Sequence, residues 1–158
     1  GMLFRSGILA GFKKRTHSVL LLPGADTWNT PKHRAIIKKA EELLDVGATV
    51  CAICGATAAL ADHGLLDQRR HTSNGPGFLE MLSPGYQGQS LYADKPSVTD
   101  GGLITAGSTG ALLWAKQIIE RLGVFEPDTL EAWYEYFSTG KPEHFFALMQ
   151  TLPAGKDN

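Results

Sequence analysis

The chain has 158 residues, of which 43% are hydrophobic and 20% charged, and its formal net charge at pH 7 is −1. This size and composition predict one globular domain over residues 1–158, and a charge so close to zero argues against partners such as nucleic acid or an anionic membrane. No apolar stretch reaches membrane-spanning length, and two cysteines do not make the disulfide framework of a secreted scaffold, so we expect a cytoplasmic protein.

The first half of the chain alternates apolar runs with a helical pattern. Ser18 to Leu22 is an uninterrupted apolar run closed by Pro23-Gly24, which predicts a central strand of a parallel sheet. A helix is expected from Pro31 to about Val46, followed by a strand from Thr49 to Ile53 and a helix from Cys54 to Ala61. These segments form a strand-helix-strand unit.

The second half is predicted to complete the sheet and add helices. The sequence indicates short or weak strands at 70–74, 90–92, 97–99 and 103–105, a hairpin turn at 100–102, and helices at 78–82, 107–122, 128–137 and from 142. The hairpin would form an antiparallel margin of the sheet. Strands that alternate with helices predict an α/β fold, a three-layer sandwich with a mostly parallel sheet.

Cys54 is the candidate nucleophile. It stands where the Thr49 to Ile53 strand changes sharply into a helix, and its neighbours Ala52, Gly55 and Ala56 are small enough for a tight turn. Such a turn directs the side chain above the sheet, and the N-terminus of the following helix favours the thiolate, which is the reactive form. The alternative is a buried structural cysteine, which is common for this residue type.

The chain resembles the ThiJ/PfpI family, whose members share a flavodoxin-like fold with the class I glutamine amidotransferase domain. The resemblance runs from about Ser18 to Phe137. Its specific points are the segments Leu22 to Trp28, Ala52 to Ala56, Gly64 to Leu66, Arg70 to Asn74 and Val98 to Ala106.

The resemblance implies that Cys54 is the family's reactive cysteine and that the Pro23-Gly24-Ala25 loop approaches it. The backbone N–H groups of Ala25 and Gly55 would then form an oxyanion hole. Asp26 and Trp28, on the same loop, would line the pocket. For Trp28, an interface or packing role is equally compatible with the sequence. Relatives usually carry a second glycine where Ala25 stands, so the loop is expected to have a different shape here.

The proton acceptor differs from the family pattern. Many relatives place a histidine beside the cysteine or at the position of Asn74, where this chain has Gly55 and Asn74. His71 is the nearest histidine, although strand alternation would direct it to the opposite face from Asn74. It is therefore either an assisting residue or a partly exposed strand histidine. Asn74 would orient a substrate or donate a hydrogen bond to an oxyanion.

The two ends of the chain also differ from the family pattern. Seventeen residues precede the Ser18 strand, too few for the strand-helix-strand unit and the acidic loop with which the family normally begins, so we expect an N-terminally shortened domain in which residues 7–12 supply a makeshift strand. Exposed sheet edges would favour a homo-oligomer such as a dimer. The late His-Pro-Glu of glutamine amidotransferases is absent, because Lys141 to His144 has another order.

Three further motifs favour simpler interpretations. Cys51 and Cys54 form a Cys-x-x-Cys, but Cys51 falls inside the strand, whereas redox pairs place both sulfurs at the helix start. The histidines at positions 17, 33, 63, 71 and 144 lack metal-ligand spacing, and we expect neither a metal nor a cofactor. Gly107 to Gly110 is predicted to be an ordinary helix start.

Three functions follow as hypotheses. The first is a cysteine hydrolase or amidase resembling intracellular proteases, or a glyoxalase-like enzyme, acting on a small-molecule substrate. The second is a redox sensor or stress-response protein in which Cys54 oxidises reversibly. The third is a structural remnant that oligomerises without catalysis.

Overall fold

The structure is a computed structural model that describes residues 17–153. Its strands are β1 (Val19–Leu22), β2 (Thr49–Ile53), β3 (Ser97–Asp100) and β4 (Leu103–Ala106), and its α-helices are α2 (Arg34–Asp45), α3 (Gly55–Asp62), α4 (Phe78–Leu82), α5 (Ala111–Leu122), α6 (Pro127–Thr139) and α7 (Pro142–Thr151). Three short 3-10 turns complete the described elements: η2 (Pro31–His33), η3 (Gln89–Leu91) and η4 (Ser108–Gly110). Residues 7–12, predicted as a makeshift strand, lie outside the described residues.

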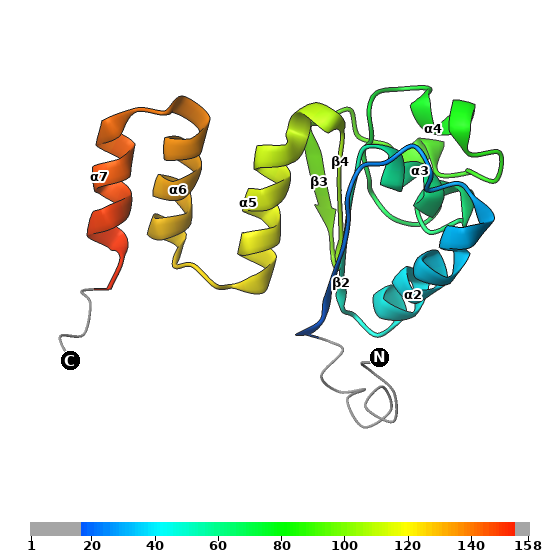
Figure 1. The fold of residues 1–158 in the computed structure, drawn as a ribbon, viewed down its shortest axis with the longest axis horizontal. Helices are drawn as coiled ribbons and strands as arrows, with labels where there is room; N and C mark the ends of the chain where they lie inside the picture. The colour runs from blue at the N-terminus through cyan, green and yellow to red at the C-terminus, as the bar shows by residue number, and fades with distance from the viewer. Residues whose placement is uncertain (1–16, 154–158) are drawn as a thin grey trace.

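The four strands form a mixed sheet in the order β1-β2-β4-β3. β1, β2 and β4 are parallel, and β3 pairs with β4 antiparallel through the predicted hairpin. Helices α2 and α3 cover one face of the sheet and α5 covers the other (Figure 1). The predicted α/β three-layer sandwich with a mostly parallel sheet is confirmed.

The main core lies between the sheet and the α2–α3 layer. Ile37 and Leu43 of α2 and Leu60 of α3 pack against Val50 and Leu103 of the sheet. Each such side chain contributes roughly 1.5–3 kcal/mol when fully buried. This packing explains why the apolar positions of the sequence identified the segments of β1, β2 and α2 correctly.

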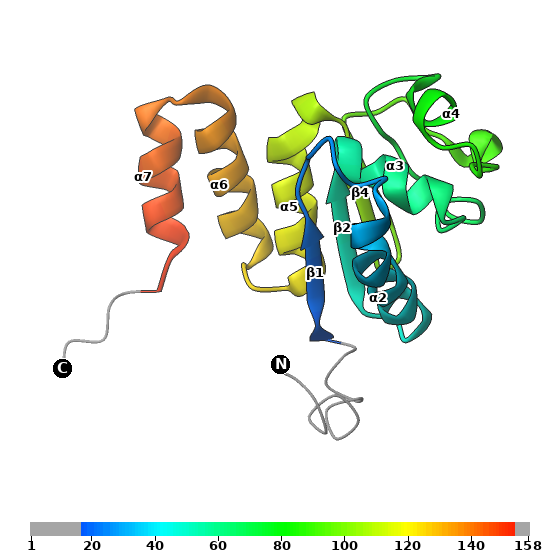
Figure 2. The same ribbon diagram turned by 45° about the vertical axis from the view of Figure 1, so that its right-hand side comes forward.

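Helices α6 and α7 extend the molecule away from the sheet. α6 packs on α5 and α7 packs on α6, so the three helices stand in a row, with α6 and α7 on the far side of α5 from the sheet (Figures 1 and 2). Pro127 and Pro142 begin the last two helices, and Gly123 and Gly140, both in the left-handed conformation, end α5 and α6. Large apolar side chains of α6 and α7 stay exposed, notably Phe137 and Phe146.

Three sequence predictions were wrong in detail. β1 was expected at the centre of the sheet, but among residues 17–153 it pairs with β2 alone and lies at the edge, where Leu21 is 55% exposed (Figure 2). Residues 70–74 form a single bridge between His71 and Tyr92 instead of a strand. Residues 90–92 belong mostly to the turn η3. An apolar run does not show how many strands flank it, and in β1 only Leu22 is fully buried.

Candidate functional site

Cys54 occupies a strained bend between β2 and α3. Its φ of 55° and ψ of −126° make it the one residue other than glycine with a positive φ among residues 17–153. A backbone of this kind costs of order 1–3 kcal/mol and persists only when its surroundings hold it. Here the Cys54 N–H donates to the Ala106 carbonyl at 3.0 Å, and the Cys54 carbonyl accepts from the N–H and the hydroxyl of Thr57.

Two glycines leave room for this bend. A Cβ on Gly24 would lie 3.1 Å from the Cβ of Cys54 and 3.7 Å from its sulfur, and a Cβ on Gly55 would lie 2.3 Å from the Ala25 carbonyl oxygen. The loop after β1 therefore lies directly against the cysteine and the first residue of α3. This matches the expected approach of the Pro23-Gly24-Ala25 loop to Cys54.

The backbone N–H groups of Ala25 and Gly55 belong to the two segments in contact, and a Cβ on Gly55 would lie 3.6 Å from the Ala25 nitrogen. Within residues 17–153 neither N–H donates a hydrogen bond to another residue. The first N–H groups of a helix have no partner inside the helix, which accounts for Gly55. Two backbone donors beside the nucleophile are thus available to a ligand that carries a partial negative charge.

Asn74 contacts the sulfur directly. Its Nδ2 donates to Cys54 Sγ at 3.3 Å, and its Oδ1 accepts from the Ser108 N–H at 2.8 Å. Because a backbone N–H can only donate, the second bond fixes the orientation of the amide, and the group that faces the sulfur is a donor. Asn74 can therefore stabilise a negative sulfur but cannot take a proton from it.

His71 lies in a different environment. Its side chain is 0% exposed, with Nδ1 at 2.6 Å from the Arg69 carbonyl oxygen and Nε2 at 2.7 Å from the Tyr86 hydroxyl. Both ring nitrogens are occupied, so of the two residues predicted to assist Cys54, the structure brings Asn74 to the sulfur. The expectation of a partly exposed strand histidine was also wrong.

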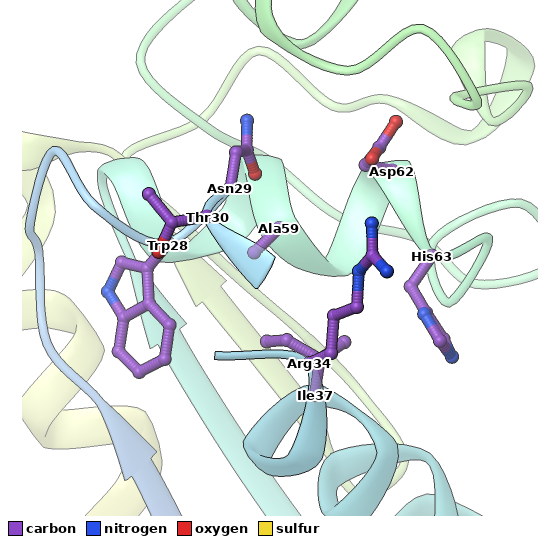
Figure 3. A pocket seen from close by; sticks show the side chains of 8 residues that line it. All are labelled: Trp28, Asn29, Thr30, Arg34, Ile37, Ala59, Asp62 and His63. Atoms are coloured by element: carbon purple, nitrogen blue, oxygen red, sulfur yellow. The ribbon is translucent and has the colours of Figure 1, made fainter. Parts of the chain in front are cut away.

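Trp28 faces a hollow on the α2–α3 side of the sheet. Its indole N–H donates to the Pro23 carbonyl at 2.6 Å, and its ring lies 4.9 Å from that of His33. The hollow is lined by Trp28, Asn29, Thr30, Arg34, Ile37, Ala59, Asp62 and His63 (Figure 3). Cys54 is not among these residues. Asp26 is exposed on the same loop.

A second hollow adjoins the cysteine through Asn74. It is lined by Ser73, Asn74, Gly75, Asp94, Lys95, Pro96, Gly107, Ser108 and Thr109. Its walls are the turn before α5 and the loop before β3, and most of its lining groups are polar.

Cys51 differs sharply from Cys54. It is 0% exposed within β2, and burial raises the pKa of its thiol to about 12. A thiol with so high a pKa stays protonated at neutral pH and is a poor nucleophile. Both cysteines are free thiols.

Several residues of the site were missed in the sequence. Thr57 caps the bend, its hydroxyl also lies 2.7 Å from that of Ser73, and the Ser108 N–H orients Asn74. The signal for Thr57 was a hydroxyl residue three positions after the bend, a spacing at which a side chain bonds the backbone. Nothing local in the sequence joins residues 73 and 108 to residue 54.

The DJ-1/PfpI family model matches residues 8–121 of the chain. The chain belongs to the DJ-1/PfpI family. This confirms the resemblance drawn from the motifs around Cys54.

Individual relatives agree with this assignment. The chain is 42% identical over 137 residues to the "Uncharacterized protease YoaZ" of Bacillus subtilis, a match that covers 87% of this chain and 65% of that protein. It is 26% identical over 123 residues to the "Uncharacterized protease YdeA" of the same organism, over 78% of this chain and 61% of that protein. A crystal structure of the thiJ/pfpI family protein from Bacillus anthracis superposes with a TM-score of 0.83 at 41% identity, over 85% of this chain and 63% of that one. This DJ-1/PfpI chain thus spans less than two thirds of the length of each of these three relatives.

Metal-binding clusters and membrane-spanning helices are both absent from residues 17–153. No group of three or more His, Cys, Asp or Glu side chains in this part of the DJ-1/PfpI chain is arranged to hold a metal ion. None of its helices is long and apolar enough to cross a membrane.

His71 makes the stability of the fold depend on pH. Burial lowers its pKa below the ordinary 6.5, opposed by the Arg69 carbonyl and the charges of Asp67 and Glu80, and it lies against Tyr86 and Tyr92. The unfolded chain therefore binds a proton more readily than the folded one. We expect the contribution of His71 to the free energy of unfolding to be complete above pH 6.5 and to be lost as the pH falls through the lowered pKa of the folded state.

Urea denaturation at pH 7.5 and 5.5 measures this dependence. His71→Gln should lower stability at pH 7.5 by about 1–3 kcal/mol, because a buried hydrogen-bond partner is lost, and should flatten the pH dependence. The exposed His63 serves as the control, and His63→Gln should keep the parent's difference in stability between pH 7.5 and pH 5.5. The prediction would be contradicted if His71→Gln lost as much stability as the parent chain between pH 7.5 and pH 5.5.

Proposed function

We propose that this chain carries the nucleophile of a cysteine-dependent hydrolase or amidase acting on a small amide or ester, with Cys54 as the attacking residue. The supporting observation is the strained bend that holds the sulfur against the Asn74 amide. Beside it stand the N–H groups of Ala25 and Gly55, which have no hydrogen-bond partner among residues 17–153. A donor on the sulfur and two donors on the neighbouring backbone suit a reaction in which charge moves from sulfur to oxygen.

The proposed reaction has two steps. The Cys54 thiolate forms a C–S bond to the carbonyl carbon, and the carbonyl electrons move onto the oxygen, which the Ala25 and Gly55 N–H groups stabilise. The C–N or C–O bond then breaks, and the leaving group takes a proton from water. A second water hydrolyses the thioester to a carboxylic acid and restores the thiol.

Proton transfer is the distinctive part of this site. Asn74 presents a donor to the sulfur, and both nitrogens of His71 are engaged elsewhere. Among the described residues no side-chain base bonds Cys54, so the thiolate must exist before the substrate arrives. Such a mechanism favours acyl groups with good leaving groups, and the rate should follow the thiolate fraction.

A glyoxalase-like reaction is compatible with the same groups. The thiolate would add to the aldehyde carbon of an α-oxoaldehyde. Water would then carry a proton from that carbon to its neighbour, through an enediol, to give a 2-hydroxy thioester, and a second water would release the 2-hydroxy acid and restore the thiol. This sequence needs no external oxidant or reductant.

Turnover by Cys54 variants tests the proposal. The parent chain should hydrolyse members of a panel of activated esters, amides and α-oxoaldehydes, and Cys54→Ser should lose at least about 100-fold in kcat/KM because the weaker nucleophile has no base. Cys51→Ser, which changes the buried thiol, is the matched control and should keep the parent rate. No turnover by the parent, or equal loss in both variants, would contradict the hydrolase proposal.

A redox sensor or stress-response protein is the second candidate. The observation that favours it is the same donor on the sulfur without a base, since Asn74 Nδ2 can hold a thiolate and then the oxygen of a sulfenate. In the oxidation the sulfur attacks one oxygen of a peroxide, the O–O bond breaks, and hydroxide leaves.

Mass spectrometry after mild peroxide treatment tests this candidate. Cys54 should gain one or two oxygen atoms while Cys51 stays unmodified, and a thiol reductant should reverse the first addition. Cys54 that remains unmodified while exposed methionines such as Met81 oxidise would exclude the sensor.

We further propose that the chain forms one domain and works in the cytoplasm as a homodimer. Two free thiols suit a reducing compartment. Exposed apolar side chains on α6 and α7, with Phe146 62% exposed, suit a contact between two copies.

Sedimentation and cell fractionation check these points. The parent chain should sediment as a dimer, and Phe146→Glu should shift it to the monomer, while Met81→Glu, a change at an even more exposed apolar residue on α4, should not. A parent chain that stays monomeric at high concentration, or that fractionates outside the cytoplasm, would contradict them.

A further inference from the structure

The segment that carries Asn74 is held by side chains instead of a strand ladder. The Arg70 N–H donates to the Asp100 carboxylate at 2.7 Å, the Thr72 N–H donates to the Thr105 hydroxyl at 2.9 Å, and the Thr72 hydroxyl donates to the Lys95 carbonyl at 2.8 Å. Backbone pairing is limited to the bridge at His71. The position of Asn74 therefore depends on how firmly such side chains hold residues 70–73.

His71 joins this segment to the loop after α4. A carbonyl can only accept, so Nδ1 donates to the Arg69 carbonyl, Nε2 is unprotonated, and the Tyr86 hydroxyl donates to it. The Tyr86 ring meets the His71 ring edge-on, with centroids 5.5 Å apart. Burial, together with nearby carboxylates, raises the pKa of Tyr86 to about 12, so its hydroxyl keeps the proton it donates.

There is little free space around this pair. A Cβ on Gly88 would lie 2.9 Å from Cε1 of Tyr86 and 3.0 Å from Cε1 of His71. The Tyr92 ring packs edge-on to His71 from another side, with centroids 5.9 Å apart. The Tyr92 hydroxyl is buried and has no hydrogen-bond partner among the described residues, so that ring contacts His71 by packing alone.

We propose that the Tyr86–His71 hydrogen bond is a positioning device that holds residues 70–74 so that the Asn74 amide stays on the Cys54 sulfur. His71 and Tyr86 act through Asn74 and do not touch the reacting atoms. The inference rests on the proposed role of Cys54 as the reactive thiol, and it deepens that role by assigning its regulation to a buried pair outside the site.

The rate of Cys54 alkylation by iodoacetamide at pH 7 is the test, because it reports the thiolate without requiring turnover. Asn74→Ala should slow alkylation, since the donor on the sulfur is lost. Tyr86→Phe, which removes one hydroxyl, should slow it about three- to fivefold and move the pH–rate profile to higher pH, the scale of one hydrogen bond. The double variant should react at the rate of Asn74→Ala alone.

Two internal controls separate positioning from loss of structure. Tyr92→Phe removes a hydroxyl of the same aromatic cluster that has no hydrogen-bond partner among the described residues, so it should leave the rate unchanged. Cys51 is buried, so its labelling reports opening of the fold, and it should stay unlabelled in every variant that is compared. If Tyr86→Phe opens the fold, His71→Gln replaces it, with the same expected pattern.

Three results would overturn the proposal. In the first, Tyr86→Phe alkylates at the parent rate although Asn74→Ala is slowed. In the second, Tyr86→Phe slows alkylation by the same factor whether residue 74 is Asn or Ala. In the third, Tyr92→Phe slows alkylation as much as Tyr86→Phe does. Failure of the hydrolase proposal is recognised separately, as a parent chain whose Cys54 alkylates with the expected pattern but turns over no substrate.

Discussion

The positive φ of Cys54 is the constraint on which the site depends. Its cost is offset because the N–H bonds the last residue of β4, Ala106, and the carbonyl bonds Thr57 of α3. These bonds tie the bend to the carboxyl edge of the parallel strands β1, β2 and β4. The loop after β1 and the turn after β4 end at the same edge, so both arrive beside the sulfur, which is where ligands bind in open α/β sheets.

The polarity of the Asn74 amide decides which chemistry the sulfur can undertake. Its oxygen is engaged by the Ser108 N–H, which leaves only donors for Cys54. A histidine at this position could exchange a proton with the thiol, whereas the amide can only donate a hydrogen bond to the sulfur, which favours its negative form. Nucleophilic attack and oxidation of the thiolate both begin from that charged state. The same geometry therefore suits both proposed functions, which differ in whether the thiolate attacks a carbonyl compound or a peroxide.

The sequence was most informative where burial sets the structure. The apolar runs of β1 and β2 and the periodic positions of α2 predicted their elements because these side chains fill one core. The bend at Cys54 was predictable from its small neighbours. Residues 70–74 were not, because their backbone N–H groups bond partners distant in sequence, such as Asp100 and Thr105. For the same reason the pairing of His71 with Tyr86 left no local pattern. Residues 89–91 overlap the strand expected at 90–92 but close a local 3-10 turn, in which the Leu91 N–H donates to the Gly88 carbonyl.

The two cysteines show how strongly position controls thiol chemistry. Cys51 pairs in register with Leu21 and Ile104 inside the sheet, and burial raises the pKa of its thiol to about 12. Three residues of extended chain separate Cα atoms by about 10 Å, whereas a disulfide needs about 4.4–6.8 Å. Cys51 therefore does not form a disulfide with Cys54 while β2 is intact. A sulfenic acid at Cys54 would need a thiol other than Cys51 to resolve it.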